Sequence, residues 1–153
     1  MSSSSSSDVR LAAASLDDRF RRRFEAAFLG DMDAALEGLG VSRAELEAAM
    51  KETGDIRSIE VDGEDAGSAW LELRGARVHV HALPLDPAFR GRGIGRRALD
   101  LVAEEFRGRA DEIELAVERG NAPAERLYES AGFVEVESPH GDLGFRVLRR
   151  RIS

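Results

Sequence analysis

The first third of the chain has the apolar spacing of amphipathic helices. Phe20, Phe24 and Phe28 recur every four positions, which places them on one face of a helix that we expect to pack in the core. Ser15 and Asp18 precede this stripe with the spacing of a capping box, which predicts where the helix begins.

Three further elements are predicted in the same third. Ser42 and Glu45 have capping-box spacing ahead of a helix that is expected to end near Gly54. Residues 31–39 are expected to add a helical turn or two, and residues 9–13 read as a short first strand.

From Ile56 onward the pattern becomes typical of strands. Three runs at 56–61, 69–73 and 78–85 are separated by turn residues at 62–63 and 75. Connections this short join antiparallel neighbours.

The last part of the chain mixes helices and strands. The pattern predicts a helix over 94–106, a strand over 113–117, a helix over 123–131, and a closing hairpin of 133–136 with 145–151 around 139–141. A helix precedes the strand at 113–117, so this strand should run parallel to the one before it. The order predicts a mixed α/β fold of the α+β kind.

Length and composition limit the organisation of the chain. Its 153 residues predict a single domain over 8–153, preceded by a Ser-rich tail over 1–7 that is expected to be disordered. No apolar run approaches the roughly 20 residues of a membrane span. The N-terminus also lacks the features of a secretory signal, so we expect a cytoplasmic protein with no membrane partner.

Charge and cysteine content exclude several functions. The formal net charge of −7 disfavours binding to nucleic acid phosphates, so no nucleic-acid partner is expected. The same acidity suits a cationic amine substrate or serves solubility alone. The absence of cysteine excludes disulfides, thiolate metal ligands and a cysteine nucleophile.

Candidate chemistry is concentrated where the strand at 78–85 turns into the next helix, in the segment RGRGIGRR from Arg90 to Arg97. Its three glycines let the backbone approach a ligand closely. The unpaired N–H groups and the dipole of the helix that follows favour an anion such as pyrophosphate. The alternative is a tight strand-to-helix corner that binds nothing.

Three nucleotide-binding patterns compete for this loop. A Walker loop would end in Gly-Lys-Ser/Thr, which is absent. A dinucleotide fingerprint would need glycine at Arg96, which disfavours a nicotinamide-binding fragment. The third pattern, Arg/Gln-x-x-Gly-x-Gly/Ala, is met at Arg90, Gly93 and Gly95.

Two segments together resemble the GNAT superfamily of acetyltransferases: LPLDPAFRGRGIGRRAL at 83–99 and LAVERGNAPAERLYESAGF at 115–133. With the order of elements, the resemblance covers residues 9–151. It implies a mostly antiparallel central sheet of about six to seven strands flanked by about four helices. A splayed parallel pair of strands would form the CoA cleft.

The resemblance also implies acetyl-CoA as cosubstrate, without a metal. The pyrophosphate would lie on the loop amides, and the pantetheine arm would run between the splayed strands that end at Leu85 and Val117. The implied cofactor-binding residues are Leu83, Leu85, Arg90, Gly91, Arg92, Gly93, Ile94, Gly95, Arg96 and Asn121. Asn121 is alternatively a helix cap.

Tyr128 is the only tyrosine and matches the family's usual general acid, which protonates the departing thiolate. Its alternative role is that of an interfacial aromatic whose hydroxyl finds a structural partner. An oxyanion donor is expected in a backbone N–H near Leu83, where Pro84 would distort the strand.

The general base has several candidates. One branch of the family places a glutamate at the position of His79, and another places one at the position of Ala116, a departure that argues against the second mechanism. His79 is the first candidate because histidine titrates near neutrality, and Glu118 is the second. A solvent-facing or packing role is the alternative for each of them and for the remaining candidates, His81, Glu72 and Glu114.

The sequence therefore predicts an enzyme, an N-acetyltransferase acting on a primary amine of a small molecule, peptide or protein. The alternative is a non-catalytic regulatory module that binds acyl-CoA. The expected partners are acetyl-CoA and an amine-bearing acceptor, and strand exchange or edge pairing would allow a homodimer.

Overall fold

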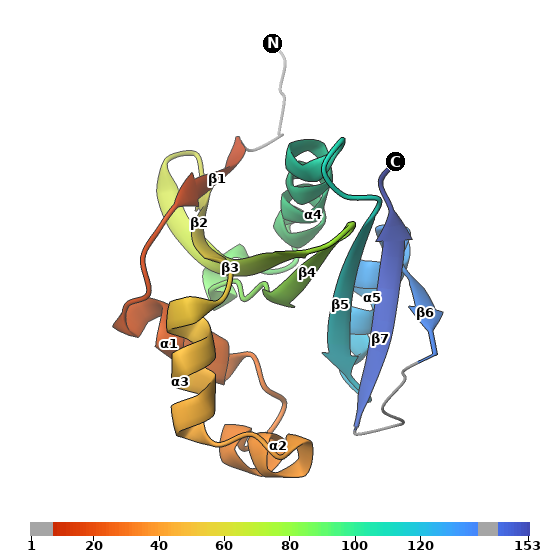
Figure 1. Ribbon diagram of the computed structural model, residues 1–153. Helices are drawn as coiled ribbons and strands as arrows, with labels where there is room; N and C mark the ends of the chain where they lie inside the picture. Colours follow the sequence, from red (N-terminus) through yellow and green to blue (C-terminus); the bar gives the residue numbers. More distant parts are fainter. Residues whose placement is uncertain (1–7, 138–143) are drawn as a thin grey trace.

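A single sheet organises the molecule. The computed structural model describes residues 8–137 and 144–153, and within them seven strands lie in the order β1-β2-β3-β4-β5-β7-β6 (Figure 1). The strands are β1 (Val9–Ala13), β2 (Asp55–Val61), β3 (Glu64–Arg74), β4 (Arg77–Ala82), β5 (Glu112–Glu118), β6 (Val134–Val136) and β7 (Phe145–Arg151). Neighbouring strands are antiparallel except β4 and β5, which are parallel as predicted.

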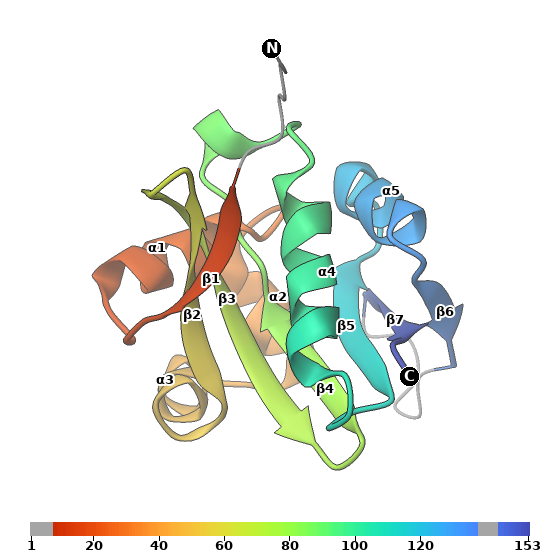
Figure 2. The same cartoon turned by 90° about the horizontal axis from the view of Figure 1, so that it is seen from above.

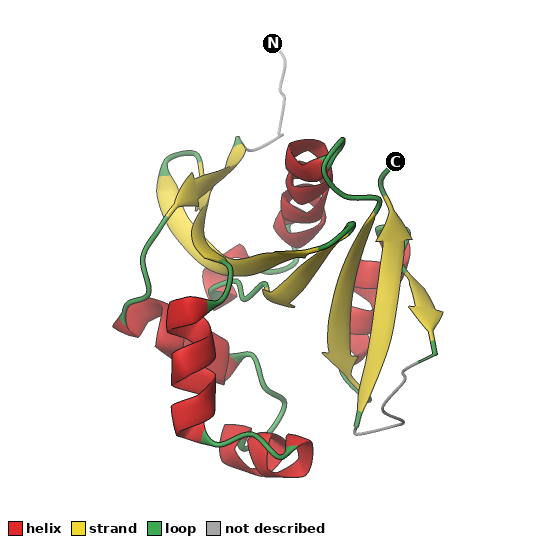
Figure 3. Cartoon of the chain, viewed as in Figure 1, coloured by secondary structure: helices red, strands yellow, loops and turns green. Residues whose placement is uncertain are grey.

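Helices cover both faces of this sheet, as the colouring by secondary structure in Figure 3 makes plain. Helices α4 and α5 lie on one face, and α1, α2 and α3 lie on the other (Figure 2). The α-helices of the described residues are α1 (Asp18–Ala26), α2 (Met32–Leu39), α3 (Arg43–Glu52), α4 (Ile94–Phe106) and α5 (Ala122–Ser130), and η1 (Pro87–Phe89) is a 3₁₀ turn. The predicted mixed α/β fold with a mostly antiparallel sheet is confirmed, with five α-helices in the described part where about four were expected.

The two faces have separate hydrophobic clusters. One is built from α4, α5 and the sheet residues between them, including Val78, Val80 and Leu115. The other packs the first three helices on the sheet and contains Phe20 and Trp70. Phe20 and Phe24 are buried in this cluster, as predicted, whereas Phe28 lies beyond the end of α1 and is only partly buried against it.

The helix starts follow local hydrogen-bonding rules. The capping box of Ser42 and Glu45 is present in both directions, as predicted. The prediction of a capping box formed by Ser15 and Asp18 is wrong, because Asp17 is the residue directly before the helix. Its backbone is extended, and its carboxylate accepts the N–H of Phe20 at 2.8 Å.

Two strand boundaries differ from the prediction by more than one residue. Strand β3 begins at Glu64 rather than at residue 69, because residues 64–68 pair with β2, with Ala66 as an extra residue, and have no apolar alternation that would reveal them. Strand β4 ends at Ala82 rather than at Leu85, although a bridge between Gly67 and Leu85 extends the pairing with β3.

Several predictions concern residues outside this description. The tail over 1–7 and the turn at 139–141 lie outside the described residues, and the single domain over 8–153 stays a prediction. Across the described ranges, every helix is too short or too polar to cross a lipid bilayer.

Candidate active site

Strands β4 and β5 pair only over part of their length. Their register runs from Arg77 opposite Glu112 to Val80 opposite Leu115, and beyond these residues the strands diverge (Figure 1). We call the region beyond Val80 and Leu115 the split. It corresponds to the splayed pair that the resemblance implied.

Residues 83–86 form one wall of the split and remain attached to β3. The Ser68 N–H donates to the Pro84 carbonyl at 3.0 Å, and the Asp86 N–H donates to the Ala66 carbonyl at 2.9 Å. Successive residues of a strand present their backbone groups to opposite sides. The N–H and C=O groups of Leu83 and Leu85 therefore face away from β3, toward the split.

A β-bulge precedes this segment. Trp70 lies opposite Ala82 while Leu71 lies opposite Val80, so His81 is the extra residue. The distortion was expected at Pro84, which instead stays in register because its carbonyl accepts the Ser68 N–H and its missing N–H removes only one ladder hydrogen bond. The bulge changes the direction of the strand just where it separates from β5.

The glycine loop leads from η1 into α4. Gly91 and Gly93 have φ of 73° and 77°, a left-handed conformation that glycine adopts without a steric cost. Gly93 is the N-cap of α4 and supplies no side-chain cap, and the Arg97 N–H bonds the Gly93 carbonyl at 3.1 Å. The N–H groups of the first turn, at 94–96, lie ahead of this bond and are available to an anion.

Gly95 brings a second helix to this turn. A Cβ at Gly95 would lie 3.0 Å from Leu127 Cδ2 and 3.8 Å from Leu85 Cδ1. The missing side chain therefore allows α5 to pack on the first turn of α4, next to the wall of the split. Tyr128 follows Leu127 in α5, so the helix that carries the predicted acid packs on the helix that the predicted loop begins.

The arginines of the loop have different environments. Arg90 Nε donates to the Leu85 carbonyl at 3.1 Å, which braces the wall of the split. The guanidinium of Arg92 lies 5.3 Å from the centroid of the Phe89 ring. Arg92 and Arg96 are exposed, as required of side chains that would reach a phosphate.

Tyr128 is half-buried against the α4 and α5 cluster, with its ring centroid 5.9 Å from that of Phe133. Burial raises the pKa of Tyr128 to about 12, so the phenol stays protonated across the physiological range. Among the residues that the structure describes, none hydrogen-bonds its hydroxyl, so the structural partner considered as the alternative is not found there.

Asn121 has the alternative role that the sequence allowed. It is the N-cap of α5, and its side-chain oxygen accepts the Ala124 N–H at 3.3 Å. This bond leaves the amide NH₂ as a donor, so a contact with a cofactor stays a prediction.

The two histidines of β4 each bond a carboxylate. His79 Nδ1 lies 2.9 Å from Glu114 Oε1, and His81 Nε2 lies 2.8 Å from Glu72 Oε1. Burial lowers the pKa of His79 and lowers that of His81 to about 4, so both rings are neutral at pH 7. An ionised carboxylate only accepts, so His79 carries its proton on Nδ1 and keeps Nε2 free to take another.

Glu114 has a second partner besides His79. Arg149 Nε donates to Glu114 Oε2 at 2.9 Å. Although burial opposes ionisation, the hydrogen bonds from His79 and Arg149 hold the pKa of Glu114 below its usual value. Glu114 is therefore an ionised orienting group for His79.

The carboxylate of Glu118 is hydrogen-bonded to the loop between α1 and α2. Its Oε1 accepts the Leu29 N–H at 3.0 Å, which ties this loop to the end of β5. His79 pairs with Glu114, and four residues of strand separate Glu114 from Glu118, roughly 13 Å. The structure does not bring the two base candidates together.

Tyr128 and His79 lie on opposite faces of the sheet. Val78 and Val80 point into the cluster under α4, so His79 between them points to the face of α1, α2 and α3. Tyr128 lies on the α4 and α5 side. The two side chains could act on one ligand only if that ligand passes through the sheet at the split.

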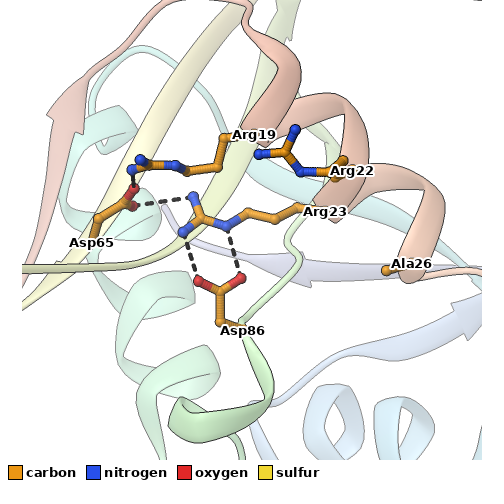
Figure 4. A pocket seen from close by; sticks show the side chains of 6 residues that line it. All are labelled: Arg19, Arg22, Arg23, Ala26, Asp65 and Asp86. Atoms are coloured by element: carbon orange, nitrogen blue, oxygen red, sulfur yellow. Dashed lines mark hydrogen bonds and ion pairs between the residues drawn. The ribbon is translucent and has the colours of Figure 1, made fainter.

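Sequence reasoning missed one charged group near this site. A pocket of about 550 Å³ lies beside α1. Its lining includes Arg23, which is bonded to Asp86 and Asp65 (Figure 4). Arg23 follows Phe20 by three positions and precedes Phe24, so it lies on the apolar face of α1. That position was a readable signal of a buried charge.

The part of the chain that the structure describes contains no group of three or more His, Cys, Asp or Glu side chains placed to hold a metal ion.

Comparison with known proteins supplies a family. Residues 16–133 match the sequence profile described as the Acetyltransferase (GNAT) family. A mycothiol acetyltransferase of Beutenbergia cavernae is 40% identical over 77 residues, which are 49% of this chain and 26% of that protein. The N-alpha-acetyltransferase RimI of Mycobacterium tuberculosis is 44% identical over 57 residues, which are 37% of this chain and 35% of that protein.

The matched segments thus span about a quarter to a third of these relatives. Among solved structures, a GNAT family acetyltransferase from Elizabethkingia anophelis with acetyl-CoA bound has a TM-score of 0.69 at 13% identity. That match covers 97% of this chain and 99% of the other, and at this identity it supports the fold alone.

Proposed function

Because the chain belongs to the GNAT family of acetyltransferases, we propose that it is an enzyme that transfers the acetyl group of acetyl-CoA to a primary amine of a small molecule, peptide or protein. One observation carries the proposal. The uncapped first turn of α4 opens beside the split between β4 and β5. This pairing of an anion site with a channel between strands suits a long phosphorylated thioester.

The residues present fit acetyl-CoA. The pyrophosphate would lie on the N–H groups at 92–96, with Arg90, Arg92 and Arg96 nearby. The pantetheine arm would extend along the wall of the split, where the backbone groups of Leu83 and Leu85 face an incoming chain. Bound acetyl-CoA supplies the thioester that reacts.

Three groups of this chain would serve the transfer. The Leu83 N–H would donate to the carbonyl oxygen as it gains charge. Tyr128 would donate its proton to the sulfur that leaves, acting as general acid. His79, oriented by Glu114, would accept the proton that the amine loses, and Glu118 is the second candidate for that role.

The acceptor that suits this site best is an α-amine. An α-amine has an unperturbed pKa of about 8 and a lysine side chain about 10.4, so roughly one in ten of the former and one in a few thousand of the latter are neutral at pH 7. Both base candidates already hold other groups, Glu114 and Leu29, which favours an acceptor that needs little help. The name of the related N-alpha-acetyltransferase points the same way.

A panel of amines assayed for CoA thiol release tests the proposal. It should include a peptide with a free N-terminus and no lysine, and the matched peptide with a blocked N-terminus and one lysine. We expect release with the first peptide at least tenfold faster than with the second at pH 7, from the difference in neutral fraction.

The other outcomes separate the alternatives. Binding of acetyl-CoA with no release for any amine would favour the regulatory module. Absence of acetyl-CoA binding would contradict the assignment of the glycine loop itself. A homodimer stays a prediction, which sedimentation of the purified chain would test.

A further inference from the structure

Arg23 is a buried charge on the apolar face of α1. It is 9% exposed, and each of its three guanidinium nitrogens donates to at least one acceptor. Figure 4 shows the bonds to Asp86 and Asp65. Nε and Nη2 donate to the two carboxylate oxygens of Asp86 at 2.9 and 2.7 Å. Nη1 lies 3.1 Å from Asp65 Oδ1, from Ser68 Oγ and from the Gly67 carbonyl oxygen.

These acceptors all belong to β3 or to the end of the wall at 83–86. The two pieces of chain are in close contact, because a Cβ at Gly67 would lie 2.4 Å from the Pro84 carbonyl oxygen. The Asp86 N–H also bonds the Ala66 carbonyl. Arg23 therefore joins three elements at one point: α1, β3 and the last residue of the wall.

The wall is the segment whose geometry matters for a ligand. Leu85 precedes Asp86 directly, and its carbonyl is bonded by Arg90 Nε, the first residue of the glycine loop motif. A displacement of Asp86 would move the backbone groups of Leu85 and Leu83 relative to the split. Errors of about 1 Å in such groups can cost up to about 100-fold in rate.

Stability alone gives a weak reason for this ion pair. The Asp86 side chain is 38% exposed, so solvent screens the attraction, while burial of the Arg23 guanidinium costs desolvation. The planar fork of arginine, however, fixes a carboxylate in both position and orientation, which a lysine ammonium cannot do. The arrangement is suited to holding Asp86 in one place.

We propose that Arg23 is a positioning residue for the cosubstrate: its two-point bond to Asp86 holds residues 83–86 against β3, so that the Leu83 and Leu85 backbone groups stay directed into the split. This role rests on the proposed function, since acetyl-CoA is the ligand that would use those groups. Arg23 itself touches neither the thioester nor the acceptor.

Arg23→Lys is the test variant, because it keeps the charge and removes the fork. Arg21→Lys is the matched control. Arg21 lies on the same helix and forms an equivalent two-point bond, with Nε 3.1 Å and Nη2 2.7 Å from the carboxylate of Glu47. Glu47 belongs to α3 and is remote in sequence from the wall.

Two readouts are needed on the full chain. Calorimetry gives the acetyl-CoA Kd, and hydrogen exchange gives the protection of amides at 83–86. We expect Arg23→Lys to weaken acetyl-CoA binding by about tenfold and to speed exchange in this segment, while Arg21→Lys changes each by less than about twofold. Asp86→Asn should reproduce the effect, and the double variant should be little worse than either single one.

The outcomes distinguish this role from the proposed function. If the wild-type chain binds acetyl-CoA and Arg23→Lys binds it within twofold, the positioning role is refuted and the function stands. If the wild-type chain binds none, the proposed function is refuted, and the exchange data still decide whether Arg23 holds the segment. If Arg23→Lys fails to fold, Asp86→Asn, which retains one carbonyl acceptor, is measured in its place against the same thresholds.

Discussion

Replacing Tyr128 by phenylalanine removes one hydroxyl and leaves the ring that packs against Phe133. The fold should therefore be retained, and thermal melting checks this. We expect kcat to fall by about 10- to 150-fold, while the Kd for acetyl-CoA changes less than twofold.

The magnitude follows from two pKa values. Burial raises the pKa of Tyr128 to about 12, whereas a thiol has an unperturbed pKa of about 8.5. Complete proton transfer from this phenol to a thiolate is unfavourable by about 3.5 pKa units, or about 5 kcal/mol. The proton of Tyr128 is therefore only partly transferred in the transition state, and its contribution there is close to that of a hydrogen bond to a charged atom, about 1.5 to 3 kcal/mol, which corresponds to the stated loss.

Thiol release at saturating acetyl-CoA between pH 7 and 10 is the assay. Because the phenol keeps its proton throughout this range, its titration should cause no decline in the wild-type rate. The pH profiles of wild type and Tyr128→Phe should therefore have the same shape. A Tyr128→Phe enzyme with kcat within twofold of wild type would refute the assignment of Tyr128 as proton donor. A large loss of acetyl-CoA affinity would instead show a binding role.

Three further predictions address the base and the stability. His79→Gln keeps a donor for Glu114 but cannot take a proton, so kcat should fall at least about tenfold and the decline of kcat/KM below about pH 6.5 should disappear. Glu118→Gln still accepts the Leu29 N–H, and its kcat should stay within about twofold of wild type. The reverse order of the two effects would make Glu118 the base. The pKa of His81 is lowered from 6.5 to about 4, so the unfolded state binds more protons between these pH values, and the free energy of unfolding should fall on acidification by up to about 1.4 kcal/mol per pH unit. Urea titrations at several pH values should show a smaller dependence of this free energy on pH in His81→Gln. An unchanged pH dependence would contradict the prediction. Phe20→Ala should lower the free energy of unfolding by about 3 to 5 kcal/mol, measured by urea denaturation, and a loss under about 1 kcal/mol would contradict its place in the core.

Sequence periodicity was sufficient where a single local rule decides the structure. The aromatic stripe of α1, the capping box of Ser42 and the parallel placement of β5 each depend on spacing or connectivity alone. The same holds for the glycine loop, whose positive φ at Gly91 and Gly93 requires the residue type seen in the sequence.

The remaining features depend on long-range contacts. Residues 64–68 of β3 lack an apolar alternation, and only the pairing with β2 and with Leu85 makes them a strand. The bulge at His81 arises from the register between β3 and β4, which Pro84 did not reveal. Arg23 finds its partner Asp86 63 residues away, a distance that no local pattern spans.

The same limit applies to the base candidates. His79 and Glu114 meet because β4 and β5 pair in a parallel register that places these two residues opposite each other. The tie between Glu118 and Leu29 joins the end of β5 to a helix connection 89 residues earlier. Whether a carboxylate is available for chemistry is thus decided by tertiary contacts.

The central claim is that the uncapped first turn of α4 binds the pyrophosphate of acetyl-CoA, and a pair of glycine substitutions tests it most directly. Gly93 and Gly75 both have positive φ, of 77° and 59°, and open space where a Cβ would stand, but Gly75 lies in the turn between β3 and β4. Glutamate at either position introduces similar backbone strain and the same charge. Calorimetric titration with acetyl-CoA should show binding abolished in Gly93→Glu and retained within about twofold in Gly75→Glu. Equal affinity in the two variants would contradict the claim.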